Sequence, residues 1–144
     1  MLVSQILKSK SDYAVVTVLP GASVAEVAKL LASRKIGTVV VSADGKQVAG
    51  IVSERDIVAE VARNGSACVI SMVDAIMTRN VTGCALTDHA DTILQKMTDG
   101  RFRHMPVMEN GAMVGLISIG DVVKARLSEL AMEKEALEGM IKGF

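Results

Sequence analysis

The sequence predicts a mixed α/β (α+β) protein built from two similar halves, and a repeated motif is the main observation behind this prediction. Residues 50–56 read Gly-Ile-Val-Ser-Glu-Arg-Asp, and residues 115–121 read Gly-Leu-Ile-Ser-Ile-Gly-Asp. A turn and a short apolar run precede each copy, and a helix-like segment follows it. A duplicated strand, turn and helix predicts two halves packed face to face, in which each half offers a ligand the same groups.

Each half is expected to open with a short helix and a short strand. Residues 3–8 place apolar side chains at helical spacing, and residues 73–77 repeat this pattern. Residues 15–19 are apolar and extended in character, with a weaker counterpart at residues 81–86.

A longer helix should follow in each half. Ser23 precedes an apolar helical stripe, and Glu26 stands three residues later, as in a capping box. We therefore expect a helix of about three turns after Ser23. Residues 90–97 carry the matching stripe, which Asp88 or His89 would cap.

Two turn signals predict a hairpin in each half. Asp44-Gly45 and Asn110-Gly111 both lie between apolar runs, and these dipeptides are the strongest short signals for a hairpin. The strands that they join are expected at residues 39–41, 48–52, 105–108 and 113–117. Each half is thus expected to run helix, strand, helix, strand, strand, helix.

The last helix is expected to continue past the second motif, from Val122 onward. Leu127, Leu130, Leu137 and Ile141 form an apolar stripe among Lys, Arg and Glu residues. The stripe is consistent with a helix that lies on its own domain and equally with a contact between two copies in a dimer.

Composition limits the classes of function. Half of the 144 residues are hydrophobic but only 2% are aromatic, so the core should be aliphatic. The 16 basic residues balance the 16 acidic ones, and neither a nucleic-acid partner nor a membrane partner is expected. Cys68 and Cys84 form no Cys-x-x-Cys motif, and the two histidines provide no zinc spacing. Without an apolar export signal or membrane span, we expect a cytoplasmic protein.

The repeated Ser-x-x-Asp pattern has two explanations. Each copy precedes an apolar helix and is close to a capping box, and for one copy alone this structural role would be favoured. Its repetition also favours a binding role, because a helix N-terminus attracts anions and a carboxylate on its first turn can accept both hydroxyls of a ribose. The glycine of the motif lets a ligand or a neighbouring backbone come close.

The second informative run is residues 100–107, Gly-Arg-Phe-Arg-His-Met-Pro-Val. It is either a solvated loop that leads into a buried strand, or a place where Arg103 and His104 face a cleft and bind phosphate. The first half has Arg-Lys-Ile-Gly-Thr at residues 34–38, without the histidine and proline. Two unequal sites are therefore expected.

Taken together, these motifs resemble a tandem pair of CBS (cystathionine-β-synthase-type) domains, also called a Bateman module. The two Gly-to-Asp runs, residues 103–107 and the opening segments 3–7 and 73–78 carry the resemblance, which extends over about residues 3–128. It implies a stand-alone pair of β-α-β-β-α units packed through their sheets with pseudo-twofold symmetry, plus a C-terminal helix. The implied divisions are residues 1–68, 69–128 and 129–144.

The resemblance also implies a ligand and its site. Clefts in such modules bind adenosine compounds: AMP, ADP, ATP, S-adenosylmethionine or a dinucleotide such as NAD(H). One site would consist of Ser53, Arg55, Asp56, Thr78, Val81, Phe102, Arg103, His104 and Met105. The other would consist of Ser118, Asp121, Val16, Thr17, Ile36, Gly37 and Thr38.

In these sites the two aspartates would hold ribose, the serines and helix ends would meet phosphate, and aliphatic strand residues would enclose adenine. Ile119-Gly120 replaces Glu54-Arg55 in the second copy, so the Asp56 site has more positive charge. We expect it to be the better polyphosphate binder.

The function favoured by the sequence is a ligand sensor. No activated nucleophile is visible and no catalytic cofactor is indicated, so an enzyme is not expected. An adenine nucleotide would change the inter-domain or dimer geometry, and an unknown protein target would read the change. The resemblance implies a homodimer. The alternative is a constitutive interaction or scaffold protein in which the Ser-x-x-Asp pairs are only caps.

Overall fold

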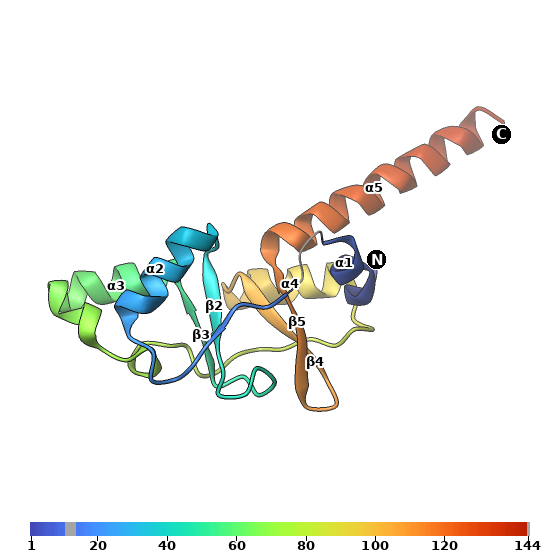
Figure 1. The fold of residues 1–144 in the computed structure, drawn as a ribbon. Coiled ribbons are helices and arrows are strands. Elements are labelled where there is room, and N and C mark those ends of the chain that lie inside the picture. Colours follow the sequence, from blue (N-terminus) through green and yellow to red (C-terminus); the bar gives the residue numbers. More distant parts are fainter. Residues whose placement is uncertain (11–13, 144) are drawn as a thin grey trace.

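The computed structural model describes residues 1–10 and 14–143 and has the mixed helix and strand architecture predicted from the sequence. Figure 1 shows two lobes side by side, each a small sheet with helices, and a long C-terminal helix that extends from the second lobe. The elements are α1 (Val3–Ser9), β1 (Thr17–Val18), α2 (Val24–Arg34), β2 (Thr38–Val41), β3 (Gly50–Ser53), α3 (Glu54–Asn64), η1 (Gly65–Ile70), η2 (Val73–Ala75), α4 (Ala90–Gly100), β4 (His104–Glu109), β5 (Ala112–Ser118) and α5 (Ile119–Ile141).

The first sheet has the three strands that the repeat predicts, whereas the second sheet, among the described residues, has two. In the first lobe β1 pairs parallel with β2, and β2 pairs antiparallel with β3. In the second lobe β4 and β5 form an antiparallel pair. The strand expected at residues 81–86 is reduced to a single parallel bridge between Cys84 and Val107. Gly83 and Ala85, both weak strand formers, flank Cys84 and account for this difference.

The two predicted turns differ in length. Asn110 and Gly111, with φ of 52° and 78°, directly join β4 to β5, as a type I′ hairpin requires. Asp44 instead lies in a longer loop, residues 42–49, because its carboxylate accepts hydrogen bonds of 2.8 Å from the N–H groups of both Lys46 and Gln47. The strand expected at residues 48–52 therefore begins only at Gly50.

The predicted cap of α2 is confirmed, whereas the predicted cap of α4 is wrong. The Ser23 hydroxyl accepts a hydrogen bond from the Glu26 N–H at 3.1 Å and caps α2 as expected. Asp88 does not cap α4, because its carboxylate accepts a hydrogen bond from the Ala85 N–H. His89 occupies the N-cap position, but its side chain makes no capping bond within the described residues.

Each opening segment packs on the core of the other half. The apolar face of α1 contributes to the same buried cluster as Ile93 and Met97 of α4. Val73, at the start of η2, lies instead in the core of the first lobe with α2. Equivalent backbone bonds fix this exchange: the Val3 N–H donates to the Asp88 carbonyl at 2.9 Å, and the Val73 N–H donates to the Ala22 carbonyl at 2.8 Å. The two halves are therefore interlocked as well as packed together.

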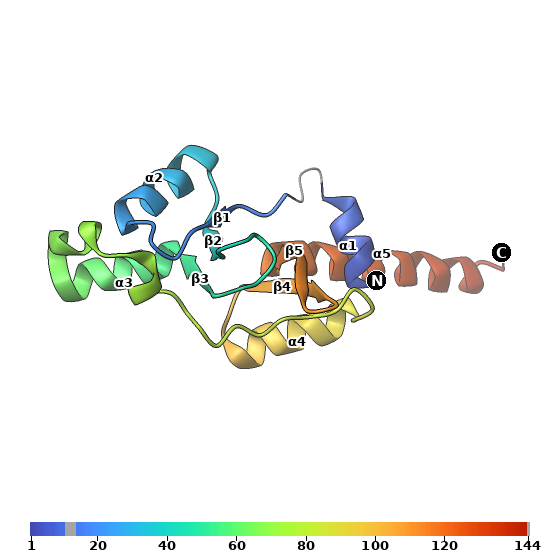
Figure 2. The same cartoon turned by 60° about the horizontal axis from the view of Figure 1, so that its bottom comes forward.

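The segment that joins the lobes supports this arrangement. Figure 2 shows the chain between α3 and α4 passing along one side of both lobes. Within it, η2 is a short 3-10 helix that replaces the helix expected at residues 73–77.

A third apolar cluster lies between the sheets. Val40 of β2, Ile51 of β3 and Met113 of β5 are buried together, with Val81 and Leu116 packed against them. The two halves therefore pack through their sheets, as the sequence predicts.

The C-terminal helix begins on its own lobe and then leaves it. Val122 and Ala125 are buried in the second core, whereas Leu127 is 63% exposed and Ile141 is 85% exposed. The N-terminal ammonium of Met1, which lies 2.8 Å from the Glu129 carboxylate, makes an ion pair to the helix beyond the buried turns. Figure 1 shows the remaining turns projecting away from the fold. Of the two sequence-based explanations, packing of the whole stripe on its own domain is thus excluded.

Candidate ligand-binding site

Both Ser-x-x-Asp motifs form capping boxes at helix starts. In the first half, the Ser53 hydroxyl accepts a hydrogen bond from the Asp56 N–H at 3.3 Å, and Oδ2 of Asp56 accepts one from the Ser53 N–H at 2.8 Å. In the second half the corresponding distances for Ser118 and Asp121 are 3.1 and 2.9 Å. Both carboxylates use Oδ2 for the cap, which leaves Oδ1 without a hydrogen bond to the described residues. Capping is thus the structural role of each motif, and one oxygen of each aspartate is left over for a further partner.

A cavity of about 520 Å³ joins the two lobes at the first motif. Its size lies in the range of small-molecule sites. Both halves line it, and among the predicted residues it brings together Ser53, Arg55, Asp56, Thr78, Val81, Phe102, Arg103 and His104. Lining residues that were not predicted are Ile51, Glu54, Asn80, Thr82, Gly100 and Arg101.

The cavity offers several kinds of chemical group. Asp56 lies at the N-terminus of α3, where a carboxylate can accept the hydroxyls of a sugar and the helix dipole attracts anions. Arg101 and Arg103 are exposed guanidinium groups on the opposite lobe, suited to phosphate oxygens. Val81 and Phe102 provide apolar surface for a planar base. Sugar, phosphate and base can thus find partners in one cavity.

Met105 does not line this cavity. It is fully buried in the second core, among residues of α1 and α4. Successive side chains of a strand point to opposite faces, so that His104 faces the cavity while Met105 turns inward. Its expected place among the cavity side chains was wrong.

Gly37 and Thr38 line the cavity of Asp56 and not a site at Asp121. Thr38 pairs with Ser53 across β2 and β3, and the Glu54 N–H donates to the Gly37 carbonyl at 2.9 Å. Strand pairing within one half therefore decides their position. The expected assignment of these two residues to the Asp121 site is corrected.

The other three residues expected beside Ser118 and Asp121 also lie elsewhere. Ile36 lines a separate groove between α2 and α3. Thr17 pairs with Val40 in the first sheet, and Val16 packs against the first core. No described contact brings these side chains to Asp121.

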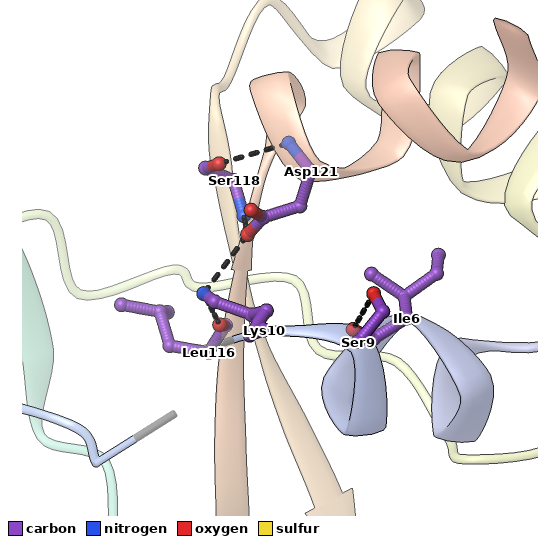
Figure 3. A network of polar contacts seen from close by, with 6 residues as sticks. All are labelled: Ile6, Ser9, Lys10, Leu116, Ser118 and Asp121. Atoms are coloured by element: carbon purple, nitrogen blue, oxygen red, sulfur yellow. Dashed lines mark hydrogen bonds and ion pairs between the residues drawn. The ribbon is translucent and has the colours of Figure 1, made fainter. Parts of the chain in front are cut away.

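The second motif holds a cation of the protein itself. The Lys10 ammonium lies 2.9 Å from Oδ2 of Asp121 and donates a second hydrogen bond of 3.0 Å to the Leu116 carbonyl (Figure 3). Burial raises the pKa of Asp121, but the Ser118 N–H and the Lys10 ammonium outweigh it and bring the pKa below the ordinary 3.8. The carboxylate is therefore ionised and already paired.

His104 lies between the two motifs. It lines the cavity of Asp56 and also pairs with Ser118 across β4 and β5. Burial lowers its pKa below 6.5 and outweighs the opposing effect of Asp121, while the cations Lys10 and Arg103 lower it further. His104 is therefore mainly neutral at pH 7, and an anion bound beside it would favour protonation.

The glycines that begin the motifs serve packing between segments of the chain. A Cβ at Gly50 would lie 2.7 Å from the Thr78 carbonyl oxygen and 2.6 Å from the Met77 sulfur. The Ile51 N–H donates to that same Thr78 carbonyl at 3.0 Å. At Gly115 the Leu7 side chain of α1 comes within 2.9 Å. Of the two roles that the sequence allows for these glycines, the structure shows the close approach of another part of the chain.

Within residues 1–10 and 14–143, no group of three or more His, Cys, Asp or Glu side chains could hold a metal ion. In the same part of the chain, no helix combines the length and apolar character needed to cross a membrane.

Comparisons with known proteins agree with the duplicated fold. A family model described as CBS domain matches residues 3–63 and 73–128. The crystal structure of a CBS-domain containing protein from Agrobacterium tumefaciens is 48% identical, with a TM-score of 0.83 over 88% of this chain and 99% of that chain. A CBS domain protein from Pyrobaculum aerophilum, solved in complex with AMP, is 31% identical, with a TM-score of 0.76 over 92% of this chain and 99% of that chain.

A relative known from its sequence is a mitochondrial CBS domain-containing protein of Arabidopsis thaliana. It is 32% identical over 148 residues, which cover 98% of this chain and 72% of that protein. The two matched segments each contain one Gly-to-Asp motif and one of the two sheets. With its two halves packed through their sheets, the chain belongs to the CBS domain family and contains a pair of CBS domains.

Proposed function

We propose that the chain is a regulatory module that binds an adenine nucleotide in the cavity at Asp56. The ligand class is AMP, ADP or ATP, with NAD(H) and S-adenosylmethionine as chemically related candidates. The observation that carries the proposal is the meeting of the Asp56 carboxylate with Arg103 and His104 of the other lobe in one cavity. The AMP complex of the Pyrobaculum aerophilum relative supports this ligand class.

In this proposal each part of the nucleotide has its own contacts. The free oxygen of Asp56 accepts ribose hydroxyls, while Oδ2 stays engaged in the helix cap. Arg103 and His104 bind phosphate oxygens, and a phosphate near His104 raises the pKa of its imidazole. Val81 and Phe102 cover the base.

The proposed ranking of the two motifs follows from their partners. Asp121 is paired with Lys10, so a sugar can use its Oδ2 only if the ammonium moves away. No described ion pair engages Asp56, and the three arginines of its cavity, Arg55, Arg101 and Arg103, outnumber the carboxylates of Glu54 and Asp56. The Asp56 cavity is therefore the preferred site for a polyphosphate.

Regulation in this proposal depends on the fact that residues of both lobes line the cavity. One lobe supplies Asp56 and the other supplies Arg103, so a ligand that contacts both favours the arrangement in which they are close. Only this difference in affinity between two arrangements can shift their populations. A protein target reads the result, and the chain itself catalyses no reaction.

A constitutive scaffold is the second candidate, and the capping boxes favour it. Both serine and aspartate pairs already satisfy helix starts, a role that needs no ligand. A scaffold and a sensor differ in one measurable property, because only the sensor gains stability when nucleotide is added.

Calorimetric titration and thermal unfolding of nucleotide-free protein with the five candidate ligands test the proposal. A ligand present at 100 times its dissociation constant should add about 2.7 kcal/mol to the free energy of unfolding. At the same ligand concentration Asp56→Asn should reduce this gain to about 0.4–1.4 kcal/mol, since an amide keeps the cap acceptor but lacks the negative charge that binds the ribose hydroxyls. Asp91→Asn, at an exposed position in the first turn of α4, is the matched control. Absence of any gain with all five compounds would favour the scaffold.

A further inference from the structure

The exposed side of α5 carries an apolar stripe that is interrupted once, at Lys134. Its members recur at alternating spacings of four and three residues along the helix, and six positions define what we call the α5 stripe: Val123, Leu127, Leu130, Lys134, Leu137 and Ile141. Leu127 is 63% exposed, Leu137 is 59% exposed and Ile141 is 85% exposed. Alternation of four and three is the heptad spacing of a coiled-coil seam, here with one lysine in the seam.

The stripe is distinct from the face that packs on the second lobe. Val122, Ala125 and Glu129 contact the fold from one side of the helix, whereas Val123 and Leu130 lie about a third of a turn away. The stripe therefore begins where α5 is anchored and continues along the projecting turns (Figure 1). A rigid base thus presents an apolar face with no partner among the described residues.

We propose that this face binds the same face of a second copy of the chain in an antiparallel coiled coil. The inference goes beyond nucleotide binding and does not depend on it. A twofold interface uses the same patch on both copies, and the stripe is long enough to form three pairs of seam layers with itself. These layers place Val123 against Ile141, Leu127 against Leu137 and Leu130 against Lys134 of the second copy.

Charges beside the seam favour the antiparallel direction. In a parallel pair, Lys134 would face its own counterpart, and Glu133 would lie beside Glu138 of the second copy. Both contacts join like charges. In the antiparallel pair Lys124 lies beside Glu138 of the second copy, and the two Glu133 carboxylates near the centre come within reach of the Lys134 ammonium groups.

A lipid surface is a poorer occupant of the same face. From Glu129 to Ile141 the helix carries four glutamates against the single Lys134. Helices that lie on anionic membranes have a polar face rich in Lys and Arg, so this charge disfavours adsorption. The charged residues beside the seam instead complement those of a second copy that runs antiparallel.

Sedimentation equilibrium of the full chain tests the interface. Leu137→Glu should weaken the dimer at least about 100-fold, because it puts a carboxylate in the apolar seam. Met132→Glu is the matched control: it adds the same charge to the same helix at a 54% exposed position on the other side and should leave the dimer unchanged. Circular dichroism of both variants checks that the fold is kept. A wild-type monomer at all concentrations, equal effects of the two substitutions, or an undisturbed Leu137→Glu dimer would each overturn the proposal.

Disulfide trapping tests the direction. Chains with Leu127→Cys and chains with Leu137→Cys are mixed and oxidised, while the native Cys68 and Cys84 remain buried. The antiparallel pairing predicts that the mixed disulfide forms much faster than either self-disulfide. Preferential self-disulfides at both positions would show a parallel pair and contradict the inferred direction.

Discussion

The ammonium of Lys10 lies 2.9 Å from the carboxylate of Asp121, although the two residues are 111 positions apart in the sequence. Asp56, the equivalent carboxylate of the first half, has no ion pair within the described residues. The two motifs therefore share their cap geometry but differ in charge. The carboxylate of Asp121 is therefore already in an ion pair, whereas that of Asp56 lies in an open cavity between the lobes.

Replacement of Lys10 by methionine should raise the pKa of Asp121 toward the ordinary 3.8, because the ion pair that favours the carboxylate is lost. Carboxyl NMR titration measures this directly. Lys8→Met removes a charge from an exposed position near the end of α1, two residues before Lys10, and should leave the titration almost unchanged. Equal shifts in the two variants would show that the ion pair is not the cause.

The same pair predicts a dependence of stability on acid. The pKa of Asp121 is lower in the folded protein than in the unfolded chain, so its contribution to stability is present above pH 3.8 and is lost as the pH falls through the folded value. Urea unfolding across this range should show a weaker acid dependence in Lys10→Met than in the wild type. An identical dependence in both proteins would contradict the prediction.

His104 should make the fold less stable below pH 6.5. Its folded pKa is lowered by burial, so the unfolded chain binds the proton more readily in the window between the folded value and 6.5. The free energy of unfolding should therefore rise with pH through this window and level off above it. His104→Gln should reduce the slope, whereas His89→Gln, at an exposed position, should retain it. If His89→Gln reduces the pH dependence of the free energy of unfolding and His104→Gln does not, the prediction for His104 is wrong.

Gly50→Ala should destabilise the fold by about 1–3 kcal/mol, because the new methyl group would press against the Thr78 carbonyl and the Met77 sulfur. Gly115→Ala should have a smaller effect, since the obstacle there is the end of the Leu7 side chain. Gly21→Ala, with open space around the added carbon, is the control for both unfolding measurements. A greater loss at Gly115 than at Gly50 would show that the backbone contact is not limiting.

Cys84 should react very slowly with a disulfide reagent in the native protein. Burial raises the pKa of its thiol to about 12, and the thiolate is the reactive form. Cys68 is buried as well, so both thiols should become reactive together only when the chain unfolds. Rapid modification of a thiol in the native state would contradict the burial of that residue.

Local patterns were sufficient to predict much of the fold. Apolar spacing located α2 and α4, Asn110-Gly111 located the second hairpin, and the duplicated motif gave the two lobes. These features depend on neighbours in the sequence, and their physical causes are local. The Ser-x-x-Asp pairs were also correct as caps, because a cap is formed within four residues.

Features that depend on distant contacts could not be predicted in this way. No local signal places α1 on the core of the second half or brings Lys10 to Asp121. The wrong grouping of Gly37 and Thr38 had a similar cause, since it assumed that the halves exchange these residues, whereas strand pairing keeps them beside Ser53. Side-chain alternation along β4 would have placed Met105 correctly if the strand boundary had been known.

The most direct test compares AMP binding to Asp56→Asn and Asp121→Asn by titration calorimetry on nucleotide-free protein. Each amide retains an acceptor for its own helix cap, so both variants should fold. We expect Asp56→Asn to weaken AMP binding roughly 10- to 100-fold and Asp121→Asn to weaken it much less. Loss of binding in Asp121→Asn, with Asp56→Asn close to the wild type, would contradict this expectation.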